Sequence, residues 1–248
     1  MDSRFERIRA ANTLAREVVT VLNRDGFVSI PGPLSGDRFN NLAEAYDQAM
    51  AEACGPDLNA GSSTTRMSDL LSFGPVFDEV FLYPPLLEAC SHFIGEPFKL
   101  SSFMARTLRP GTLAQELHVD LSRTSKDAPL FGFILMVDAF RKENGATRFV
   151  PGSHDWPDVP SDRLPDPRAK YPGEILAFGE PGTIILFNAA VWHGHTANIT
   201  EMPRRSIQGY FVRRKATQGF CFRSRLAEHI QTRMSLLARY LLALDEQP

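Results

Sequence analysis

Cysteine is scarce in this chain of 248 residues, and its three copies lie far apart. Cys54, Cys90 and Cys221 form no Cys-x-x-Cys pair, which argues against a disulfide framework and against a structural zinc site. So few cysteines are typical of proteins in a reducing compartment. We therefore expect a cytoplasmic location.

An excess of one charge and a long apolar run are also missing. The 27 basic and 29 acidic residues give a net charge of −2. Nucleic-acid-binding proteins usually have a basic excess, so we expect no such partner. The longest apolar stretches, such as residues 131–137, are about as long as a strand, whereas a bilayer requires roughly 20 residues. The N-terminal segment has no apolar signal core, and we expect no membrane partner.

Hydrophobic spacing divides the chain into a helical first part and a strand-rich remainder. Helical periodicity over residues 8–22, 35–49 and 85–94 predicts that residues 1–98 are mostly helical, with a short strand over 27–30. Residues 54–77 are interpreted as a loop with room for one short helix. A last helix is predicted over 223–244. Between them, strand-like runs are separated by turn residues at 99–108, 116–121, 130–140, 147–150, 183–187 and 205–213.

This order of elements predicts a mainly β protein with flanking helices. The strand count and spacing favour a double-stranded β-helix, a cupin-like jelly roll, over residues 99–215. We expect one domain over 1–248. An insertion over 154–174 contains five prolines and is long for a compact domain, and such loops are usually functional and often form lids.

Histidines give the first indication of chemistry. His118 and Asp120 are two residues apart in a predicted strand, so an imidazole and a carboxylate can point to the same side. Such a triplet is common by chance. A further histidine, either His193 or His195, follows the buried run 183–187 and could complete the pair. Two imidazoles and one carboxylate leave one face of an octahedral metal open, as ferrous oxygenases require.

Arg204 lies eleven residues after His193, at the start of a predicted strand. In a strand it shares one face with Ser206, Gln208 and Tyr210. A polar stripe of this kind is costly to bury unless it lines a wet cavity. A guanidinium in such a cavity can bind a carboxylate through two parallel hydrogen bonds.

Several short motifs occur in a fixed order between about residues 24 and 212. They are Asp25-Gly26-Phe27, Ile30-Pro31-Gly32, His118-Val119-Asp120, Glu143-Asn144-Gly145-Ala146, Pro151-Gly152-Ser153-His154 and His193-Gly194, with Asn198 and Arg204 behind them. In this order they resemble the phytanoyl-CoA dioxygenase (PhyH-like) family of Fe(II)/2-oxoglutarate-dependent oxygenases. The resemblance implies that His118, Asp120 and His193 bind Fe(II), that Arg204 binds the distal carboxylate of 2-oxoglutarate, and that O2 is consumed.

The resemblance also implies an activity. We expect oxidation of an unactivated C–H bond of a small molecule, in secondary (natural-product) metabolism, with release of succinate and CO2. The same cofactor chemistry could instead give oxidative cyclisation, desaturation or epimerisation. A non-catalytic cupin-like module that binds a metal or ligand is the alternative from another class. We expect a monomer or a homodimer.

Other residues are candidates for contacts around this centre. His195 stands where the family often has a small or hydroxyl residue, so its contact with the cosubstrate is open. Lys99 and Thr107, on the strand before His118, are further candidates for the cosubstrate. Candidates for substrate contacts are Arg123, Arg148, Trp156 and Tyr171.

Overall fold

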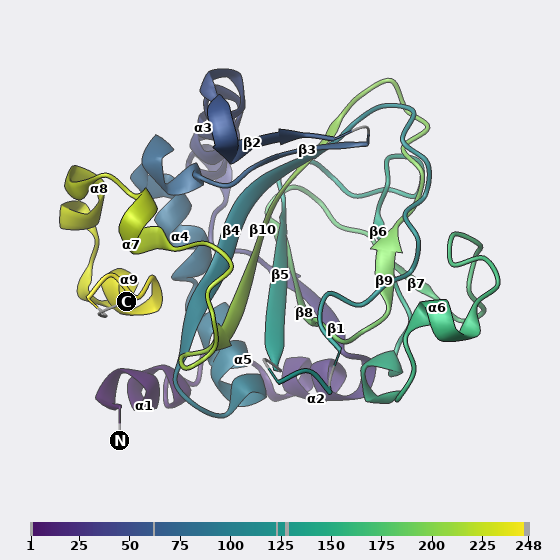
Figure 1. Cartoon of the computed structure of the whole chain (residues 1–248), viewed down its shortest axis with the longest axis horizontal. Helices are drawn as coiled ribbons and strands as arrows, with labels where there is room; N and C mark the ends of the chain where they lie inside the picture. The colour runs from purple at the N-terminus through teal and green to yellow at the C-terminus, as the bar shows by residue number, and fades with distance from the viewer. Residues whose placement is uncertain (1, 62, 123, 127–128, 246–248) are drawn as a thin grey trace.

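The computed structural model describes residues 2–61, 63–122, 124–126 and 129–245. A larger sheet, of strand order β1-β8-β5-β10-β4-β3-β2, faces a smaller sheet of order β7-β6-β9 (Figure 1). All of their pairings are antiparallel. The strands are β1 (Phe27–Pro31), β2 (Leu58–Ala60), β3 (Thr64–Met67), β4 (Phe98–Leu108), β5 (Leu130–Met136), β6 (Thr147–Phe149), β7 (Ile175–Ala177), β8 (Thr183–Asn188), β9 (His193–His195) and β10 (Arg204–Arg213). The jelly-roll prediction is confirmed.

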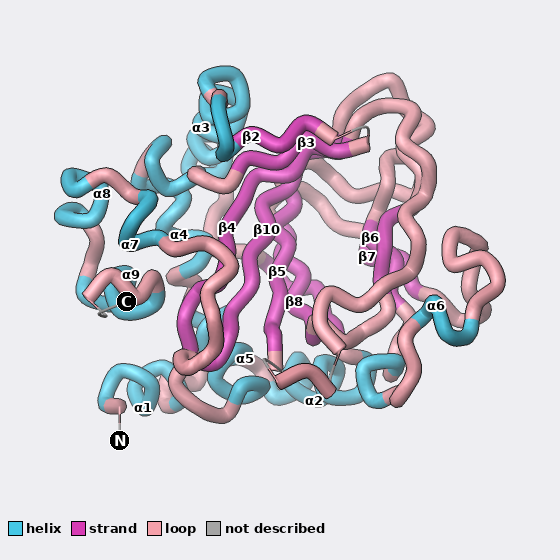
Figure 2. The backbone as a smooth tube through the Cα atoms, in the orientation of Figure 1, coloured by secondary structure: helices cyan, strands magenta, loops and turns pink. Residues whose placement is uncertain are grey.

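Helices cover the face of the larger sheet that points away from the smaller one (Figure 2). None within the described residues is long and apolar enough to cross a membrane. The α-helices are α1 (Ser3–Arg9), α2 (Arg16–Asp25), α3 (Gly36–Glu52), α4 (Asp78–Phe81), α5 (Pro84–Ile94), α6 (Pro160–Arg163), α7 (Phe222–Arg225), α8 (Glu228–Arg233) and α9 (Leu236–Leu241). Short 3-10 helices are η1 (Gly55–Asp57), η2 (Leu70–Phe73), η3 (Pro75–Phe77) and η4 (Ser153–Asp155).

The two faces of the larger sheet belong to two different cores. On β5, Phe131, Phe133 and Leu135 pack with the helices, whereas Ile134 and Met136 pack between the sheets. This is the alternation that a strand buried on both sides requires. It explains why the sequence of β5 is apolar throughout.

The first predicted helix is divided into α1 and α2. Asn12 between them has φ of +50°, a conformation outside the helix. The carboxylate of Glu88 in α5 accepts hydrogen bonds from the Thr13 hydroxyl (2.8 Å) and the Leu14 amide (3.0 Å). The Glu88 carboxylate thus binds a backbone amide at the break between the two helices. Glu88 is far away in the sequence, so the spacing of apolar residues near the break cannot predict this contact.

The single helix predicted over 223–244 is instead three short helices, α7, α8 and α9. The backbone is extended at Leu226–Ala227 and at Met234–Ser235. Gln231 donates to the carbonyls of Arg223 (2.9 Å) and Leu226 (2.8 Å), which satisfies the first break. The apolar positions have helical spacing, and side chains of all three helices join the core cluster on the helical side of the larger sheet.

The predicted strands differ from the observed ones in three places. The expected loop over 54–77 contains β2 and β3, which extend the larger sheet at its edge. Residues 116–121 form no strand but a single bridge between His118 and His193. The short strands β7 and β9, of three residues each, were not predicted.

Candidate active site

The side chains of His118, Asp120 and His193 converge on one point. The Nε2 atom of His118 lies 3.6 Å from Asp120 Oδ1, and Nε2 of His193 lies 3.2 Å from Asp120 Oδ2. All three ligand atoms lie within 4.8 Å of one another. Their side chains are 33%, 22% and 7% exposed respectively, so the cluster is open on the His118 side. Such a set could hold one divalent metal ion.

Backbone hydrogen bonds hold the segment that carries His118 and Asp120 against residues 189–193. The amide of His118 donates to the carbonyl of His193 (2.9 Å), and the amide of His193 donates to the carbonyl of His118 (3.0 Å). The Asp120 amide donates to the carbonyl of Ala189, just after β8 (2.9 Å). Two residues remote in the chain are therefore fixed opposite one another by main-chain bonds that do not depend on their side chains.

Both ligand histidines have a defined tautomer. Nδ1 of His118 lies 3.0 Å from the carbonyl oxygen of Glu116, and Nδ1 of His193 lies 2.9 Å from that of Val191. A carbonyl oxygen only accepts, so each Nδ1 carries the proton and donates. When each ring is neutral, the lone pair is therefore on Nε2 and points to the shared centre, which is the form that binds a metal. Without a metal, Nε2 can carry a proton and donate it to Asp120.

The electrostatics of the cluster favour a cation. Burial raises the pKa of Asp120, but the charge of His193 and hydrogen bonds from His118, His193 and Tyr210 outweigh it and hold the pKa well below its usual range. Burial lowers the pKa of His193, and the carboxylate of Asp120 outweighs burial and raises it. The carboxylate is therefore ionised at neutral pH and attracts positive charge.

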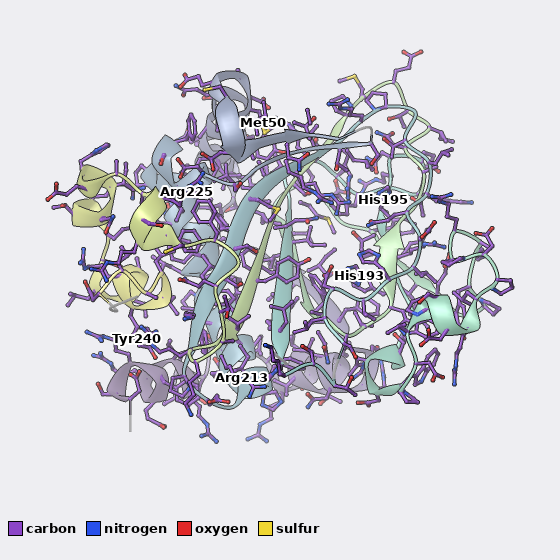
Figure 3. The ribbon with its side chains drawn as sticks, viewed as in Figure 1. Met50, His193, His195, Arg213, Arg225 and Tyr240 are labelled. Atoms are coloured by element: carbon purple, nitrogen blue, oxygen red, sulfur yellow. The ribbon has the colours of Figure 1, made fainter. Side chains whose placement is uncertain are left out.

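A cavity of about 310 Å³ adjoins the cluster, between the two sheets. Its wall includes all three residues of the cluster, Gln115, and Thr147 of β6. Side chains of β4, β9 and β10 complete it, among them Arg106, His195, Arg204 and Gln208. Figure 3 labels His193 and His195, both on β9. The larger sheet contributes the arginines of the cavity, and β9 contributes two of its imidazoles, with that of His118 as the third.

Arg204 is the first buried cation of this cavity. It is 2% exposed, and its guanidinium lies 4.0 Å from the ring centroid of Phe140. Its Nε and Nη1 atoms are buried and have no hydrogen-bond partner. Burial, with a smaller effect from Arg106, lowers its pKa to about 9, so the group is still charged at neutral pH. A buried charge with unpaired donors is costly and indicates an anionic ligand.

Arg106 on β4 is the second cation, and the sequence analysis missed it. It lies opposite Ser206 of β10 on one side and opposite Arg66 of β3 on the other. Burial lowers its pKa to about 10, and its Nε atom is buried without a partner. Within the described residues, its guanidinium makes one hydrogen bond, to the side-chain oxygen of Gln115, which is long at 3.4 Å. A charged residue inside the predicted strand 99–108 is the signal that could have found it.

His195 lines the same cavity but lies outside the metal-ligand cluster. The residue is 5% exposed, and its Nδ1 donates to the carbonyl of Thr196 (2.9 Å). Burial is the main cause that lowers its pKa to about 3, and Arg106 and Arg204 lower it further. His195 is therefore neutral at physiological pH and presents an acceptor to the cavity.

Two residues expected near the cosubstrate lie elsewhere on β4. Thr107 is on the face covered by helices, where its hydroxyl is 2.9 Å from that of Tyr46 in α3. Lys99 pairs with Val212 near the start of β4, whereas Arg106 is near its end. Neither side chain lines the cavity beside the metal cluster.

Three of the four residues expected to contact the substrate, Arg148, Trp156 and Tyr171, make contacts within the protein. Arg148 is 2% exposed and donates to the carbonyls of Gln115, Pro167 and Ala169 at 2.8–2.9 Å, with Glu174 as its ion-pair partner at 3.2 Å. These contacts tie the insertion over 154–174 to the segment before His118. Trp156 and Tyr171 pack on the Trp192 ring, with centroids 5.0 and 5.8 Å away. Arg123 lies outside the described residues.

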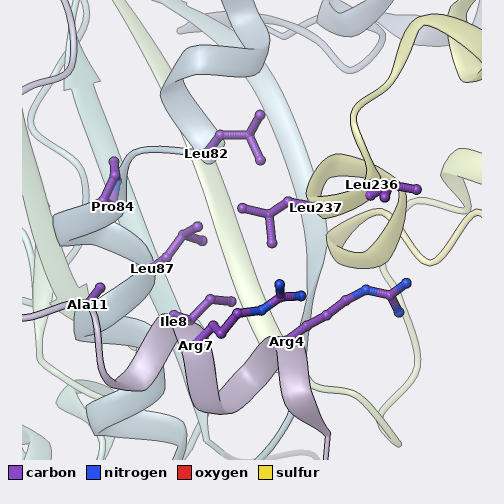
Figure 4. Close-up of a pocket in the computed structure, with 9 residues that line it drawn as sticks. All are labelled: Arg4, Arg7, Ile8, Ala11, Leu82, Pro84, Leu87, Leu236 and Leu237. Atoms are coloured by element: carbon purple, nitrogen blue, oxygen red, sulfur yellow. The ribbon is translucent and has the colours of Figure 1, made fainter.

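A second cavity, of about 480 Å³, lies between α1, α5 and α9 (Figure 4). Leucine side chains such as Leu82, Leu87 and Leu237 line most of it, and Arg4 and Arg7 are its charged members. It contains no pair of acid and base and no metal-ligand set. Of these two cavities, the smaller one between the sheets is the one that adjoins a metal-ligand set.

A jelly roll that holds two histidines and one aspartate at a common point, with buried arginines beside them, defines the class of non-haem Fe(II)/2-oxoglutarate-dependent oxygenases. The family model of phytanoyl-CoA dioxygenase (PhyH) matches residues 22–206, about three quarters of the chain. The chain belongs to this family, and it is a dioxygenase.

Characterised relatives and solved structures agree with that assignment. Dioxygenase aneA of Aspergillus aculeatus is 32% identical over 209 residues, which cover 76% of this chain and 69% of that protein. Multifunctional dioxygenase prhA of Penicillium brasilianum is 29% identical over 225 residues, 83% of this chain and 74% of that protein.

Solved structures share the fold at lower identity. HygX from Streptomyces hygroscopicus, solved with nickel and 2-oxoglutarate bound, has a TM-score of 0.67 at 20% identity and covers 83% of this chain and 89% of its own. The epimerase SnoN, solved with Fe3+, α-ketoglutarate and nogalamycin RO, also has a TM-score of 0.67, at 19% identity, with 86% and 90% coverage.

Proposed function

We propose that this protein binds Fe(II) through His118, Asp120 and His193, binds 2-oxoglutarate through Arg204, and uses O2 to oxidise an unactivated C–H bond of a small molecule. The observation that carries the proposal is a single cavity with a complete metal-ligand set and two arginines, Arg204 and Arg106, whose buried Nε atoms lack hydrogen-bond partners.

The donor set fits ferrous iron. Imidazole nitrogen suits iron, zinc and copper, and one carboxylate offsets part of the charge of a divalent ion. Three protein ligands leave coordination positions for a bidentate cosubstrate and for oxygen. The fixed Nδ1 tautomers of both histidines support this assignment, since neither ring has to reorganise to present Nε2.

The cations of the cavity fit a dicarboxylate. The unpartnered Nε and Nη1 of Arg204 offer donors to the distal carboxylate of 2-oxoglutarate. Arg106 offers its own buried Nε to the same ligand, and its charge adds to the attraction. Two of the predicted residues, Lys99 and Thr107, have no place in this proposal. His195 supplies a neutral acceptor to the cavity wall.

Iron and 2-oxoglutarate, when bound, supply the oxidation of a C–H bond coupled to the conversion of 2-oxoglutarate into succinate and CO2. The chain's own residues bind, orient and shield these groups. Arg204 and Arg106 orient the dicarboxylate, and the insertion over 154–174, fixed by Arg148, covers one side of the segment that carries His118. The apolar side chains between the sheets exclude water from the reacting centre.

The substrate class is drawn from the relatives. SnoN comes from nogalamycin biosynthesis, and HygX has been solved with hygromycin B bound, so both enzymes are associated with natural products. We assign this chain to the tailoring of a small natural product. Oxidative cyclisation, desaturation or epimerisation is compatible with the same site. Product mass separates them: hydroxylation adds one oxygen atom, and cyclisation or desaturation removes two hydrogen atoms.

The free state of all three cysteines supports the further proposal of a cytoplasmic location, because exposed Cys54 and Cys221 would be oxidised elsewhere. We propose that the chain acts as a monomer or a homodimer. Size-exclusion chromatography with light scattering measures the second point.

An anaerobic titration tests the function. Fe(II) and 2-oxoglutarate added together to the purified protein are expected to give the weak visible charge-transfer band of the chelate. O2 and substrate are then expected to yield one succinate per turnover. A protein that gives the band but never forms succinate would be a binding module of the cupin type. Absence of the band would contradict the proposed metal site.

A further inference from the structure

A tyrosine outside the predicted metal set contacts one of its members. The hydroxyl of Tyr210 donates a hydrogen bond of 2.7 Å to Oδ2 of Asp120. It is the shortest side-chain hydrogen bond that the described residues make to any of the three proposed ligands. Tyr210 lies on β10, six residues after Arg204, on the same face of the strand.

The position of Tyr210 is itself fixed by close packing. The Phe187 ring stands edge-on to the Tyr210 ring at a centroid distance of 5.9 Å and lies 5.2 Å from the ring of His193. Gly132 of β5 pairs with both Tyr210 and Phe187. A Cβ atom added at Gly132 would lie 2.3 Å from the Phe187 ring. Glycine at position 132 therefore leaves the space in which the Phe187 ring contacts both Tyr210 and His193.

Asp120 needs such a support more than the histidines do. Each histidine is held by a main-chain carbonyl at its Nδ1 and by backbone bonds across the bridge. The carboxylate of Asp120 has two oxygens, and a metal ion bound by one of them leaves the other to be oriented by a donor. Ligating carboxylates are commonly hydrogen-bonded, and loss of such a partner typically costs roughly 10–100-fold in metal affinity or activity.

We infer that Tyr210 is a positioning residue of the metal centre: its phenol fixes the rotation of the Asp120 carboxylate, and Phe187, seated over Gly132, keeps the phenol in place. Tyr210 acts on the reaction through Asp120. This inference rests on the proposed Fe(II) site and adds a residue that holds one of its ligands.

The test is the binding of Co(II) to the metal-free protein, followed by its visible absorption, with no cosubstrate and no O2. The variant Tyr210→Phe removes one hydroxyl and keeps the ring. We expect its dissociation constant for Co(II) to rise about tenfold or more. We also expect the charge-transfer band of the Fe(II)·2-oxoglutarate complex to shift, because the electron density on the carboxylate changes.

The matched control is Tyr240→Phe. Tyr240 also donates to a carboxylate, that of Asp2, at 2.6 Å. Figure 3 places Tyr240 at the opposite side of the molecule from His193. This variant is expected to lose a hydrogen bond of the same kind and to keep wild-type Co(II) affinity and the wild-type band.

The outcomes separate the two proposals. If the wild-type protein binds no Co(II), the proposed metal site is wrong. If the wild-type protein binds Co(II) and Tyr210→Phe binds it equally well with an unchanged band, only the role of Tyr210 is overturned. Gly132→Ala is a second variant with the phenol intact; we expect a smaller loss of Co(II) affinity from it, because Phe187 is displaced toward Tyr210 and His193.

Discussion

Strand β10 presents two faces with opposite properties. Ile207 and Phe211 point to the helices and are completely buried in an apolar cluster. Arg204, Gln208 and Tyr210 point to the smaller sheet and line the cavity beside the metal cluster. One strand thus serves stability on one face and chemistry on the other. The two roles differ only by the parity of the residue number, which predicts that substitutions on the two faces have separable effects.

The largest loss of activity is expected at the metal cluster. Asp120→Ala removes the one anionic ligand and leaves two neutral imidazoles, so Fe(II) binding and succinate formation are expected to fall to background. The variant is expected to melt near the wild-type temperature, because the Asp120 side chain is partly exposed and apolar packing does not depend on it. Co(II) titration and differential scanning fluorimetry measure the two effects. Activity in the variant would show that another residue supplies the anionic ligand.

Arg204→Met is expected to give the second largest loss of activity. It should change the KM for 2-oxoglutarate strongly and leave the unfolding free energy unchanged or raised. Two charge-assisted hydrogen bonds to the cosubstrate, at about 1.5–3 kcal/mol each, predict a rise in the KM for 2-oxoglutarate of about a hundredfold or more. Without 2-oxoglutarate the variant is expected to be as stable as the wild type or more so. The reason is that a buried, unpaired charge is replaced by an apolar side chain of similar size.

Arg204→Lys is the control, because it keeps the charge but not the planar fork. It is expected to give an intermediate KM. A KM that stays at the wild-type value in Arg204→Met would place the dicarboxylate elsewhere, with Arg106 as the next candidate.

Phe211→Ala tests the opposite face of the same strand. Phe211 packs against Phe98 and Phe133, with ring centroids 5.6 and 5.9 Å away. Truncation of a buried phenylalanine typically costs about 3–5 kcal/mol of unfolding free energy. We expect a large drop in the urea midpoint and an unchanged KM for 2-oxoglutarate per folded molecule. A KM effect as large as that of Arg204→Met would mean that the two faces are not independent.

The same parity explains which site residues could be predicted from the sequence. Motif order and spacing are visible in the sequence, and their resemblance to the family was enough to propose His118, Asp120, His193 and Arg204 as site residues. The jelly roll followed from the order of strands. Arg106 and Tyr210 were not assigned a role, because their importance depends on which strands are neighbours: Arg106 faces Ser206, and Tyr210 reaches Asp120 through the fold.

Elsewhere the sequence failed for a different physical reason. The breaks in the C-terminal helix and between α1 and α2 are stabilised by distant side chains, Gln231 in the first case and Glu88 in the second. Arg148 was expected to meet the substrate, yet its Nη1 and Nη2 atoms bind Glu174 and main-chain carbonyls of the insertion and of the segment before His118. Charge and spacing alone do not distinguish an arginine that binds a ligand from one that holds a loop.

Thr107→Val gives the smallest expected effect and tests the comparison at a single position. Thr107 was a candidate for the cosubstrate, but it follows Arg106 on β4 and so points to the other face, where its hydroxyl contacts that of Tyr46. Valine keeps the shape and removes one hydrogen bond, so we expect a loss of about 1 kcal/mol of unfolding free energy and no change in the KM for 2-oxoglutarate. Arg106→Met, one residue away, is expected to raise that KM without the loss of stability. If Thr107→Val raised the KM as Arg106→Met does, the face on which β4 presents its polar residues would have to be reassigned.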